Sequence, residues 1–234
     1  MFNYTDKTAL ITGGTSGIGH AIAEAFSAAG ANVIAAGLPS QAAISSKIET
    51  EHLDITDNAA VKNLLARIPQ LDIVVNAAGI IRRDREFELD IFEQVIDINL
   101  VSVMRVCSEA RPHLARTRGC IVNIASMLSF FGGARVPAYS ASKGGVAQLT
   151  RSLALAWAAE GIRVNAVAPG WIATPLTQAL KDDRERSAPL MSRTPMARWG
   201  RPDEIAGPVL FLCSEAASFM TGAIVPVDGG YSAA

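Results

Sequence analysis

The sequence predicts a single-domain α/β fold, a doubly wound seven-stranded parallel sheet with helices on both faces. Seven short apolar runs of strand length occur along the chain, and segments with helical periodicity lie between them. Strands that alternate with helices in this way form parallel sheets, which are buried on both faces. The 234 residues, half of them hydrophobic and 18% charged, suffice for one sizeable core.

The apolar runs place the strands in order along the chain. The predicted strands cover residues 8–12, 32–36, 48–53, 71–76, 120–125, 163–168 and 223–227. Helical spacing is clearest in Val146, Leu149, Leu153 and Trp157, after which Gly161 is expected to cap the helix. No fixed repeat and no low-complexity linker divides the chain, so residues 1–234 are expected to form one domain.

The segment 170–201 differs from the rest, because prolines and glycines interrupt it and it contains no clear strand. Insertions of this kind often cover an active site. Its basic residues are mixed with acidic ones, including Asp182 and Asp183. Two interpretations stay open. The segment is either a salt-bridged surface helix, with a pair such as Asp182 and Arg186, or a lid that helps to capture an anionic substrate.

Charge and cysteine content exclude several classes of protein. A net charge of −1 provides no general attraction for nucleic acid or for an anionic membrane. Cys107, Cys120 and Cys213 have no metal-ligand spacing, and their odd number in apolar surroundings indicates buried thiols in a reducing compartment. No export signal and no apolar segment of membrane-spanning length is recognised, so we expect a cytoplasmic protein without a metal site.

A glycine-rich turn follows the first strand and opens a helix. Gly13, Gly17 and Gly19 in ITGGTSGIGHAIAEAF allow a tight turn, close approach of main chain to a pyrophosphate, and close packing of helix on strand. The helix N-terminus offers free N–H groups and the positive end of its dipole to phosphate. A strand before the turn and an amphipathic helix after it indicate a Rossmann-type dinucleotide site.

Tyr139 and Lys143 are four residues apart, so that the phenol and the ammonium share one helix face. A free tyrosine has a pKa near 10, and a nearby positive charge lowers that pKa, which makes the phenol a usable acid or base. An ordinary surface pair has the same spacing. The spacing alone therefore leaves a catalytic pair and a surface pair both open.

The motifs taken together resemble those of the short-chain dehydrogenase/reductase family, and they occur in that family's order along nearly the whole chain. TGGTSGIG (12–19) follows the first strand, NAAG (76–79) the fourth, and PGWIATPL (169–176) the sixth. The tyrosine–lysine pair lies in YSASK, and VDGG (227–230) comes near the end. The resemblance implies an NAD(P)-dependent oxidoreductase that transfers a hydride between nicotinamide and a secondary alcohol or ketone.

The resemblance also implies four catalytic residues, Asn99, Ser126, Tyr139 and Lys143. Tyr139 would be the general acid/base, and Lys143 would bind the nicotinamide ribose and lower the tyrosine pKa together with the charge of oxidised nicotinamide. Ser126 would hydrogen-bond the substrate oxygen. Asn99 would hold a water that links Lys143 to solvent. These roles decide in favour of the catalytic interpretation of the tyrosine–lysine pair.

Cofactor contacts follow from the same resemblance. They are expected at Gly13, Thr15, Ser16, Gly17, Ile18, Gly19, Gly37, Asp54, Ile55, Asn76, Ala77, Ala78, Gly79, Tyr139, Lys143, Pro169, Gly170, Ile172 and Thr174. The position that often carries an aspartate for the ribose hydroxyls is Gly37 here, which removes the usual signature of NAD. However, no lysine or arginine occurs between Gly14 and Lys47 to pair with the 2′-phosphate of NADP. We therefore expect NAD.

The stretches around the catalytic residues, among them NAAGIIRRD and ERSAPLMSRTPMARWGRP, resemble sugar-acid dehydrogenases acting on compounds such as 2-deoxy-D-gluconate. A carboxylate substrate needs an arginine. The expected substrate contacts are Ser126, Met127, Arg135, Tyr139, Arg82 and Arg186, with Arg83 as a further candidate, and Trp171 and Trp199 as walls of the pocket or as core residues. Each arginine has an alternative interpretation as a surface residue.

Three alternatives compete with the sugar-acid interpretation. A 3-oxoacyl-carrier-protein reductase normally uses NADP and basic residues after the second strand, which this chain lacks. A dehydrogenase for an uncharged polyol or ketone needs no arginine in its pocket. A non-catalytic dinucleotide-binding protein has no need of all four catalytic residues. The family resemblance further implies a homotetramer that packs through two long helices, roughly 88–116 and 138–159.

Overall fold

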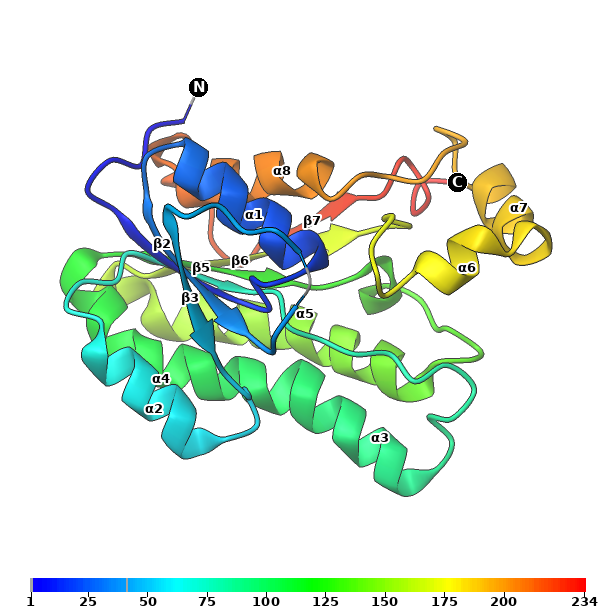
Figure 1. Cartoon of the computed structure of the whole chain (residues 1–234), viewed down its shortest axis with the longest axis horizontal. Helices are drawn as coiled ribbons and strands as arrows, with labels where there is room; N and C mark the ends of the chain where they lie inside the picture. Colours follow the sequence, from blue (N-terminus) through cyan, green and yellow to red (C-terminus); the bar gives the residue numbers. More distant parts are fainter. Residues whose placement is uncertain (1, 41) are drawn as a thin grey trace.

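The computed structural model describes residues 2–40 and 42–234 and contains a seven-stranded parallel sheet, as the sequence predicts (Figure 1). The strand order is β3-β2-β1-β4-β5-β6-β7. The strands are β1 Thr8–Thr12, β2 Asn32–Gly37, β3 Ile48–His52, β4 Ile73–Asn76, β5 Cys120–Ile124, β6 Arg163–Pro169 and β7 Ile224–Val227. The largest difference from the prediction is the start of β4, which is expected at residue 71 but lies at Ile73. Leu71 is buried in the core although it lies before the strand, so its apolar character did not mark the strand's start.

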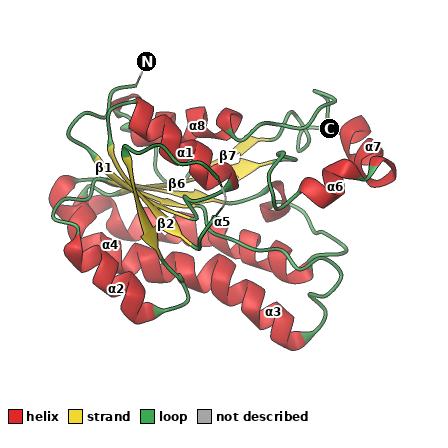
Figure 2. Cartoon of the chain, in the orientation of Figure 1, coloured by secondary structure: helices red, strands yellow, loops and turns green. Residues whose placement is uncertain are grey.

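Helices cover both faces of this sheet (Figure 2). They are α1 Gly17–Ala28, α2 Asn58–Arg67, α3 Leu89–Ile96, α4 Ser102–Thr117, α5 Pro137–Trp157, α6 Gln178–Asp182, α7 Arg184–Arg193 and α8 Asp203–Cys213. Helices α1 and α8 pack together over one face, while α2, α4 and α5 cover the other. The predicted doubly wound α/β architecture is therefore confirmed. Within the described parts of the chain, no helix combines the length and apolar character needed to cross a bilayer.

Strand β1 shows why both faces are apolar. Leu10 points into the cluster formed with α2 and α4, whereas its neighbour Ile11 joins Ile22 and Phe26 of α1 on the opposite face. All four side chains are almost fully buried. Because successive residues of a strand alternate between faces, a strand buried on both sides has no polar face at all. Each such burial contributes about 1.5–3 kcal/mol to folding.

The two long helical segments expected from the sequence are present, one of them with an interruption. Helices α3 and α4 are joined without a loop by a π-helical turn, Asp97–Val101. Helix α5 runs from Pro137 to Trp157 and is followed by a short 3-10 turn. Gly161 ends that turn with φ +78°, a left-handed conformation that favours glycine, so the predicted cap is confirmed.

The segment 170–201 contains the short helices α6 and α7, which stand at the side of the molecule where the chain ends (Figure 1). The ion pair suggested between Asp182 and Arg186 is wrong. Asp182 accepts a hydrogen bond from Gln178 (2.7 Å), whereas Arg186 contacts Asp183 at 3.8 Å. The reason is that α6 ends at Asp182 and Asp183 caps α7, so the two residues do not share one helix.

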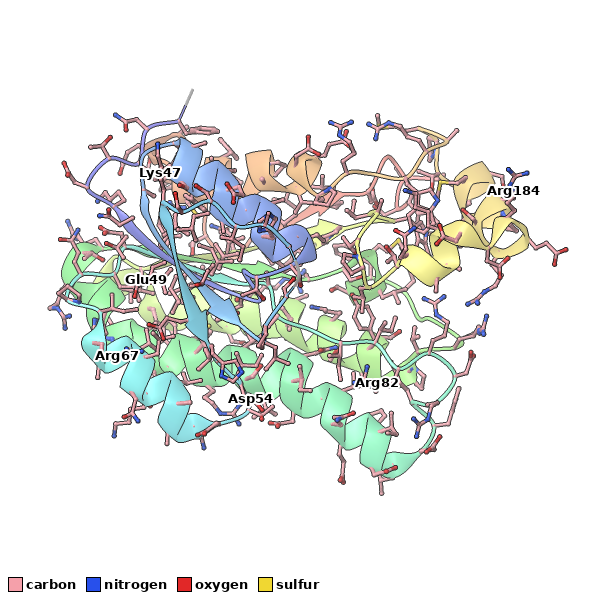
Figure 3. The ribbon with its side chains drawn as sticks, in the orientation of Figure 1. Lys47, Glu49, Asp54, Arg67, Arg82 and Arg184 are labelled. Carbon is pink, nitrogen blue, oxygen red and sulfur yellow. The ribbon has the colours of Figure 1, made fainter. Side chains whose placement is uncertain are left out.

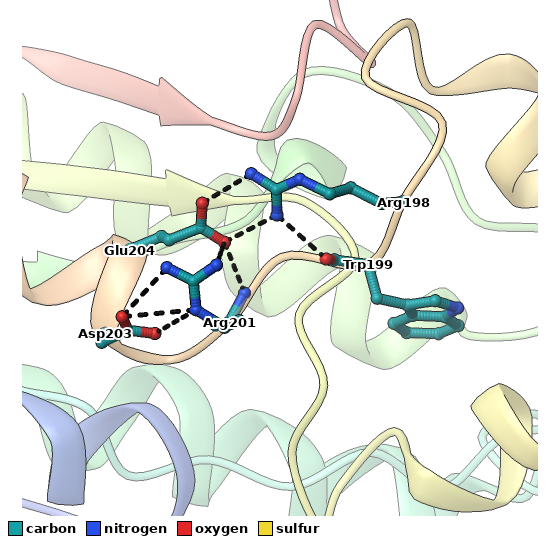
Figure 4. Close-up of polar contacts among 5 residues, drawn as sticks. All are labelled: Arg198, Trp199, Arg201, Asp203 and Glu204. Atoms are coloured by element: carbon teal, nitrogen blue, oxygen red, sulfur yellow. Dashed lines mark hydrogen bonds and ion pairs between the residues drawn. The ribbon is translucent and has the colours of Figure 1, made fainter.

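A charged network attaches the end of this segment to α8 (Figure 4). Glu204 accepts hydrogen bonds from the guanidinium of Arg198 (2.8 and 2.6 Å) and from the backbone N–H of Arg201 (2.8 Å). Arg198 also donates to the Trp199 carbonyl, and Arg201 pairs with Asp203. The hydrogen bonds from Arg198 and from the Arg201 backbone lower the pKa of Glu204 to about 2. Arg198 and Arg201 therefore already have acidic partners in the protein.

Candidate active site

A cavity of ≈ 410 Å³ opens at the carboxyl ends of the strands. The strand order reverses between β1 and β4, since the chain passes from β1 to β2 on one side and later returns to β4 on the other. Ligands of open α/β sheets bind in the crevice outside such a reversal. The cavity lining includes all of the residues expected from the sequence to contact a cofactor except Asn76. It also includes residues not singled out before, among them Leu38, Pro39, Ser40, Ile80, Pro175, Leu176 and Thr177.

Asn76 ends strand β4, and its side chain lies in the protein interior. Its amide nitrogen donates to Asn123 Oδ1 (2.9 Å) and contacts Cys107 Sγ (3.3 Å), and Asn123 in turn donates to Thr150 Oγ1 (2.9 Å). All of these groups are buried. This hydrogen-bonded chain joins β4 and β5 to the helical layer below them. The expectation that Asn76 contacts the cofactor is therefore not supported by the direction of its side chain.

The glycine turn after β1 brings main chain very close to main chain. Gly13 has φ +67°, and a Cβ atom there would lie 2.7 Å from the backbone of Ala78. A Cβ atom on Gly19 would lie 2.2 Å from the Gly13 carbonyl oxygen. Helix α1 then begins at Gly17, and the side chain of Ser16 makes no capping hydrogen bond to it. The turn and the uncapped helix N-terminus fit a dinucleotide pyrophosphate, which needs close backbone approach and N–H donors.

Ser126 and Tyr139 meet beside this cradle. Ser126 follows β5, where its Oγ accepts the N–H of Leu128 (3.1 Å) and caps a short 3-10 turn. Tyr139 lies in the first turn of α5, within hydrogen-bonding reach of the Ser126 side chain. Burial raises the pKa of Tyr139, the Ser126 hydrogen bond lowers it, and the charge of Glu86 raises it further. The net direction for the pKa is upward.

Lys143 lies one helical turn after Tyr139 and is 5% exposed. Its Nζ donates to the Ile124 carbonyl oxygen (2.6 Å) and lies 5.7 Å from the centre of the Tyr139 ring. Burial lowers the pKa of Lys143 to about 8. The expectation of a depressed tyrosine pKa is therefore not met by the protein's own groups. Burial raises the pKa of the phenol, and the Lys143 ammonium donates its hydrogen bond to a backbone carbonyl.

Asn99 lies in the π-helical turn between α3 and α4 and is fully buried. Its Oδ1 accepts the N–H of Ile80 (2.8 Å), and its Nδ2 donates to the Ile80 carbonyl (2.9 Å) and to Ser142 Oγ (3.2 Å). A Cβ atom on Gly79 would lie 3.3 Å from Asn99 Oδ1 and 3.8 Å from Lys143 Nζ. The side chain thus fixes the loop after β4 beside the lysine. A role in holding a water stays a prediction.

Glu86 is the functional candidate that sequence reasoning missed. Its carboxylate is fully buried and accepts hydrogen bonds from the backbone N–H groups of Arg82 and Tyr139, both at 2.8 Å. In the sequence it lies in RRDREFE, a run of charged residues typical of an exposed loop. Nothing in that pattern separates Glu86 from its exposed neighbour Glu88. The contact was not predictable because its two ends are 53 residues apart.

The predicted substrate arginines have different surroundings. Arg135 forms a bidentate ion pair with Asp84, with its Nε 2.6 Å from Oδ1, and is exposed. Arg82 is exposed as well, and Figure 3 shows its side chain beside the loop that precedes α3. Arg83 is half-buried, and burial together with the charges of Arg186 and Arg135 lowers its pKa. Among the described residues, no side chain forms an ion pair or hydrogen bond with the Arg83 guanidinium.

Met127 and the two tryptophans also have defined places. Met127 is 4% exposed and lies in the 3-10 turn after β5. Trp171 packs edge-on against Trp199 (6.0 Å between ring centres) and Tyr231 (6.3 Å). The Trp171 Nε1–H is buried and has no hydrogen-bond partner among the described residues. The tryptophans thus form an aromatic cluster that joins the segment 170–201 to the C-terminal turn.

Comparison with known proteins identifies the family. A family model described as Enoyl-(Acyl carrier protein) reductase matches residues 13–232. A 2-dehydro-3-deoxy-D-gluconate 5-dehydrogenase of Bacillus subtilis is 41% identical over 244 residues, which covers 98% of this chain and 96% of that protein. The chain belongs to the short-chain dehydrogenase/reductase family. It is accordingly an oxidoreductase that acts on a CH–OH group, and nicotinamide dinucleotide is the cofactor that dehydrogenases of this family bind.

Two further relatives show the range within this short-chain dehydrogenase group. A galactitol 2-dehydrogenase (L-tagatose-forming) of Cereibacter sphaeroides is 41% identical, covering 99% of this chain and 97% of that protein. A structure from Agrobacterium tumefaciens, provisionally named 2-deoxy-D-gluconate 3-dehydrogenase, has NADP bound. It is 42% identical, superposes with a TM-score of 0.91, and covers 100% of this chain and 99% of its own. Relatives at similar identity therefore carry names for both acidic and uncharged substrates.

Proposed function

We propose that this enzyme interconverts a hydroxyl and a carbonyl group on a sugar acid such as 2-deoxy-D-gluconate or a 2-keto-3-deoxygluconate-type compound. The observation that carries the proposal is the meeting of Ser126, Tyr139 and Lys143 at one end of a cavity whose other end is a glycine cradle. A proton-transferring phenol and a dinucleotide cradle in one cavity are the two parts that alcohol oxidation requires.

Tyr139 moves the proton in the proposed mechanism. In reduction its hydroxyl donates a proton to the substrate carbonyl oxygen, and in oxidation the phenolate takes the proton from the substrate hydroxyl. The bound dinucleotide supplies the two-electron redox chemistry. Ser126, next to Tyr139, hydrogen-bonds the same substrate oxygen and stabilises the charge that develops on it. Lys143 is largely protonated at neutral pH and stabilises the phenolate.

Arg83 is proposed to bind the substrate carboxylate, and like the other candidate arginines it lies outside the cavity lining. It is half-buried, and burial together with the charges of Arg186 and Arg135 lowers its pKa more than the charges of Asp84 and Glu86 raise it. A partly desolvated guanidinium without an acidic partner is destabilised, and a carboxylate anion relieves this through charge-assisted hydrogen bonds. Arg135 is a weaker candidate because Asp84 already pairs with it. The named sugar-acid relatives support an acidic substrate.

The segment 170–201 is proposed to cover the substrate. Thr174, Pro175 and Leu176 line the cavity, and Arg186 of α7 contributes to the charge around Arg83. Its remaining basic residues are mostly engaged elsewhere, for example Arg193, whose guanidinium lies 4.4 Å from the centre of the Tyr231 ring. The covering role therefore depends on the first part of the segment and on α7.

The cofactor is proposed to be NAD. The part of the cavity after β2 is lined by Gly37, Leu38, Pro39 and Ser40, and among the described residues no lysine or arginine lines it there. A Cβ atom on Gly37 would lie 2.9 Å from Thr15 Oγ1, so a larger side chain at this position would require the Thr15 side chain to move. The 2′-phosphate dianion of NADP without a cation is a worse mismatch than the ribose hydroxyls of NAD without an aspartate. The NADP in the Agrobacterium relative makes the comparison of both cofactors a necessary measurement.

The proposed assembly is a homotetramer packed through the helical segments roughly 88–116, which contains α3 and α4, and 138–159, which contains α5. A cytoplasmic location stays a prediction. Leu155 on α5 is 83% exposed, and Val101 and Met104 near the start of α4 are exposed as well. Exposed apolar side chains on these two helical segments support contact with another copy of the chain. A monomeric mass in light scattering would contradict the tetramer.

The proposed function is tested by following reduced nicotinamide absorbance with NAD and with NADP. The substrates are gluconate-type acids and matched uncharged polyols, and Tyr139→Phe serves as the blank. Turnover with NAD on an acid, without turnover on its uncharged analogue, supports the proposal. Equal rates on polyols would favour the second candidate, an uncharged-polyol dehydrogenase, for which the galactitol 2-dehydrogenase relative is the supporting observation.

A further inference from the structure

We propose that Glu86 is a positioning residue for the reaction. Its buried carboxylate links the first turn of α5 to the loop after β4, and this link sets the position of Tyr139 relative to Arg82 and Arg83. The inference rests on the proposed role of Tyr139 in proton transfer. It goes beyond that role because it assigns a function to a buried acid that touches neither the cavity nor any cation's side chain among the described residues.

The two hydrogen bonds of Glu86 carry the inference. One carboxylate oxygen accepts the N–H of Tyr139 and the other accepts the N–H of Arg82, each at 2.8 Å. The side chain is 0% exposed, so water does not compete for these bonds. A hydrogen bond to a carboxylate in a buried site is stronger than one between neutral groups. Both oxygens are occupied by donors from two different elements, and the carboxylate therefore acts as a rigid link between them.

Helix α5 needs this link because its own N-terminus lacks a cap. The N-cap residue is Val136, whose side chain cannot accept a hydrogen bond, and Pro137 and Ala138 follow it. The N–H of Tyr139 is one of the donors that a helix leaves free in its first turn. Glu86 satisfies that donor and places a negative charge at the positive end of the helix dipole. The residue that transfers the proton is thus held by its backbone.

Glu86 acts on Tyr139 through its charge as well as through its hydrogen bond. It raises the pKa of Tyr139, in the same direction as burial and against the Ser126 hydrogen bond. It also raises the pKa of Arg83, against the effect of the neighbouring arginines. Lys143 on α5 lies 5.7 Å from the centre of the Tyr139 ring. Arg83 feels the charge of Glu86 together with those of Asp84 on the same loop, Arg135 before α5 and Arg186 on α7.

The test compares Glu86→Gln, Glu86→Asp and the matched control Glu88→Gln. Glutamine offers only one carbonyl oxygen, so one of the two N–H donors loses its acceptor and faces an amide NH₂ instead. Aspartate keeps the charge on a side chain shorter by one methylene. Glu88 is exposed and pairs with Arg85 at 3.2 Å, away from Tyr139. The loop stays joined to the segment before α5 in all variants through the Asp84 N–H and the Arg135 carbonyl (2.9 Å).

Glu86→Gln is expected to lower kcat about tenfold or more, because small displacements of a reacting group cost rate. The substitution also removes a negative charge that raises the pKa of Tyr139. The limb of the pH profile for oxidation that depends on Tyr139 should therefore move to lower pH. Glu86→Asp should lose rate and keep the limb in place. Dissociation constants for the dinucleotide should match those of the wild type in both variants, and Glu88→Gln should match it in every respect.

Two outcomes separate this inference from the proposed function. If Tyr139→Phe is inactive while Glu86→Gln has the kcat and pH profile of Glu88→Gln, the positioning role is overturned and the proposed function stands. If Tyr139→Phe retains turnover, the proposed function itself fails. Equal loss of kcat in Glu86→Gln and Glu86→Asp, with no movement of the pH limb and a lowered Tm in both, would reduce Glu86 to a purely structural residue and also overturn the inference.

Discussion

The part of the cavity next to β1 is built around a tight glycine turn, whereas the part next to α5 presents the reactive side chains. Gly13 and Gly19 leave no room for a Cβ atom, so the cradle consists of backbone and the N-terminus of α1. Across the cavity, Ser126, Tyr139 and Lys143 present a hydroxyl, a phenol and an ammonium. The backbone half is suited to a cofactor that many proteins share, and the side-chain half to chemistry and to one substrate.

Tyr139→Phe should have the largest effect and acts only on the side-chain half. Loss of the proton-transferring group is expected to lower kcat about a thousandfold, within the usual range for a general acid or base. Dinucleotide affinity, followed by quenching of protein fluorescence, should fall far less than kcat, because the phosphate cradle is untouched and Tyr139 supplies only one of many expected cofactor contacts. A parallel loss of cofactor affinity would show that the two halves are not independent.

Gly13→Val should break the backbone half. The new Cβ would lie 2.7 Å from the Ala78 main chain, at a backbone angle (φ +67°) that L side chains rarely adopt. We expect dinucleotide affinity to fall about a hundredfold or more, because main chain and helix N-terminus must move apart. Titration calorimetry measures this.

The matched control for Gly13→Val is Gly207→Ala in α8. No atom lies within 4 Å of a Cβ atom built there, and the residue is exposed in a helix. This substitution should raise the free energy of unfolding by about 0.5–1 kcal/mol and leave cofactor binding unchanged. Unaltered affinity in Gly13→Val would mean that the cradle does not contact the cofactor.

Arg83→Ala should weaken substrate binding without affecting the cofactor. For a carboxylate substrate we expect KM to rise about tenfold to a hundredfold, the usual effect of removing one charge-assisted contact. Arg135→Ala serves as the comparison, since Asp84 holds that guanidinium, and its KM should change about twofold or less. Steady-state kinetics on an acid and on its uncharged analogue measure both. A larger effect of Arg135→Ala than of Arg83→Ala would reverse the assignment.

Lys143 should give the smallest effect, a dependence of stability on pH. Its pKa is about 8 in the folded protein against 10.5 for a free lysine. Between these values the unfolded chain binds more protons, so a rise in pH through this window favours the folded state. The Tm of the wild type should rise by about 4–7 °C relative to Lys143→Met from pH 7.5 to pH 9.5. Parallel Tm curves for the two proteins would show that burial does not shift this lysine.

The elements that the sequence predicted correctly depend on residues close together in the chain. Strands of four to seven mostly apolar residues follow from local composition, and the turn at Gly13 follows from the glycines themselves. The shared helix face of Tyr139 and Lys143 follows from their spacing. The order of the motifs indicated the family, because each motif is a short stretch of neighbouring residues that can be read directly from the sequence. The NAD preference and the tetramer stay predictions.

The remaining features were decided by tertiary structure. Glu86 reaches Tyr139 across 53 residues, Arg135 finds Asp84 across 51, and Asn76 turns inward to Asn123 on the neighbouring strand. The raised pKa of Tyr139 has the same origin, because desolvation depends on what surrounds a side chain. The sequence alone determined which elements form and which chemical groups the site contains. Tertiary structure decided which groups are buried and paired, because burial and pairing depend on contacts between distant segments.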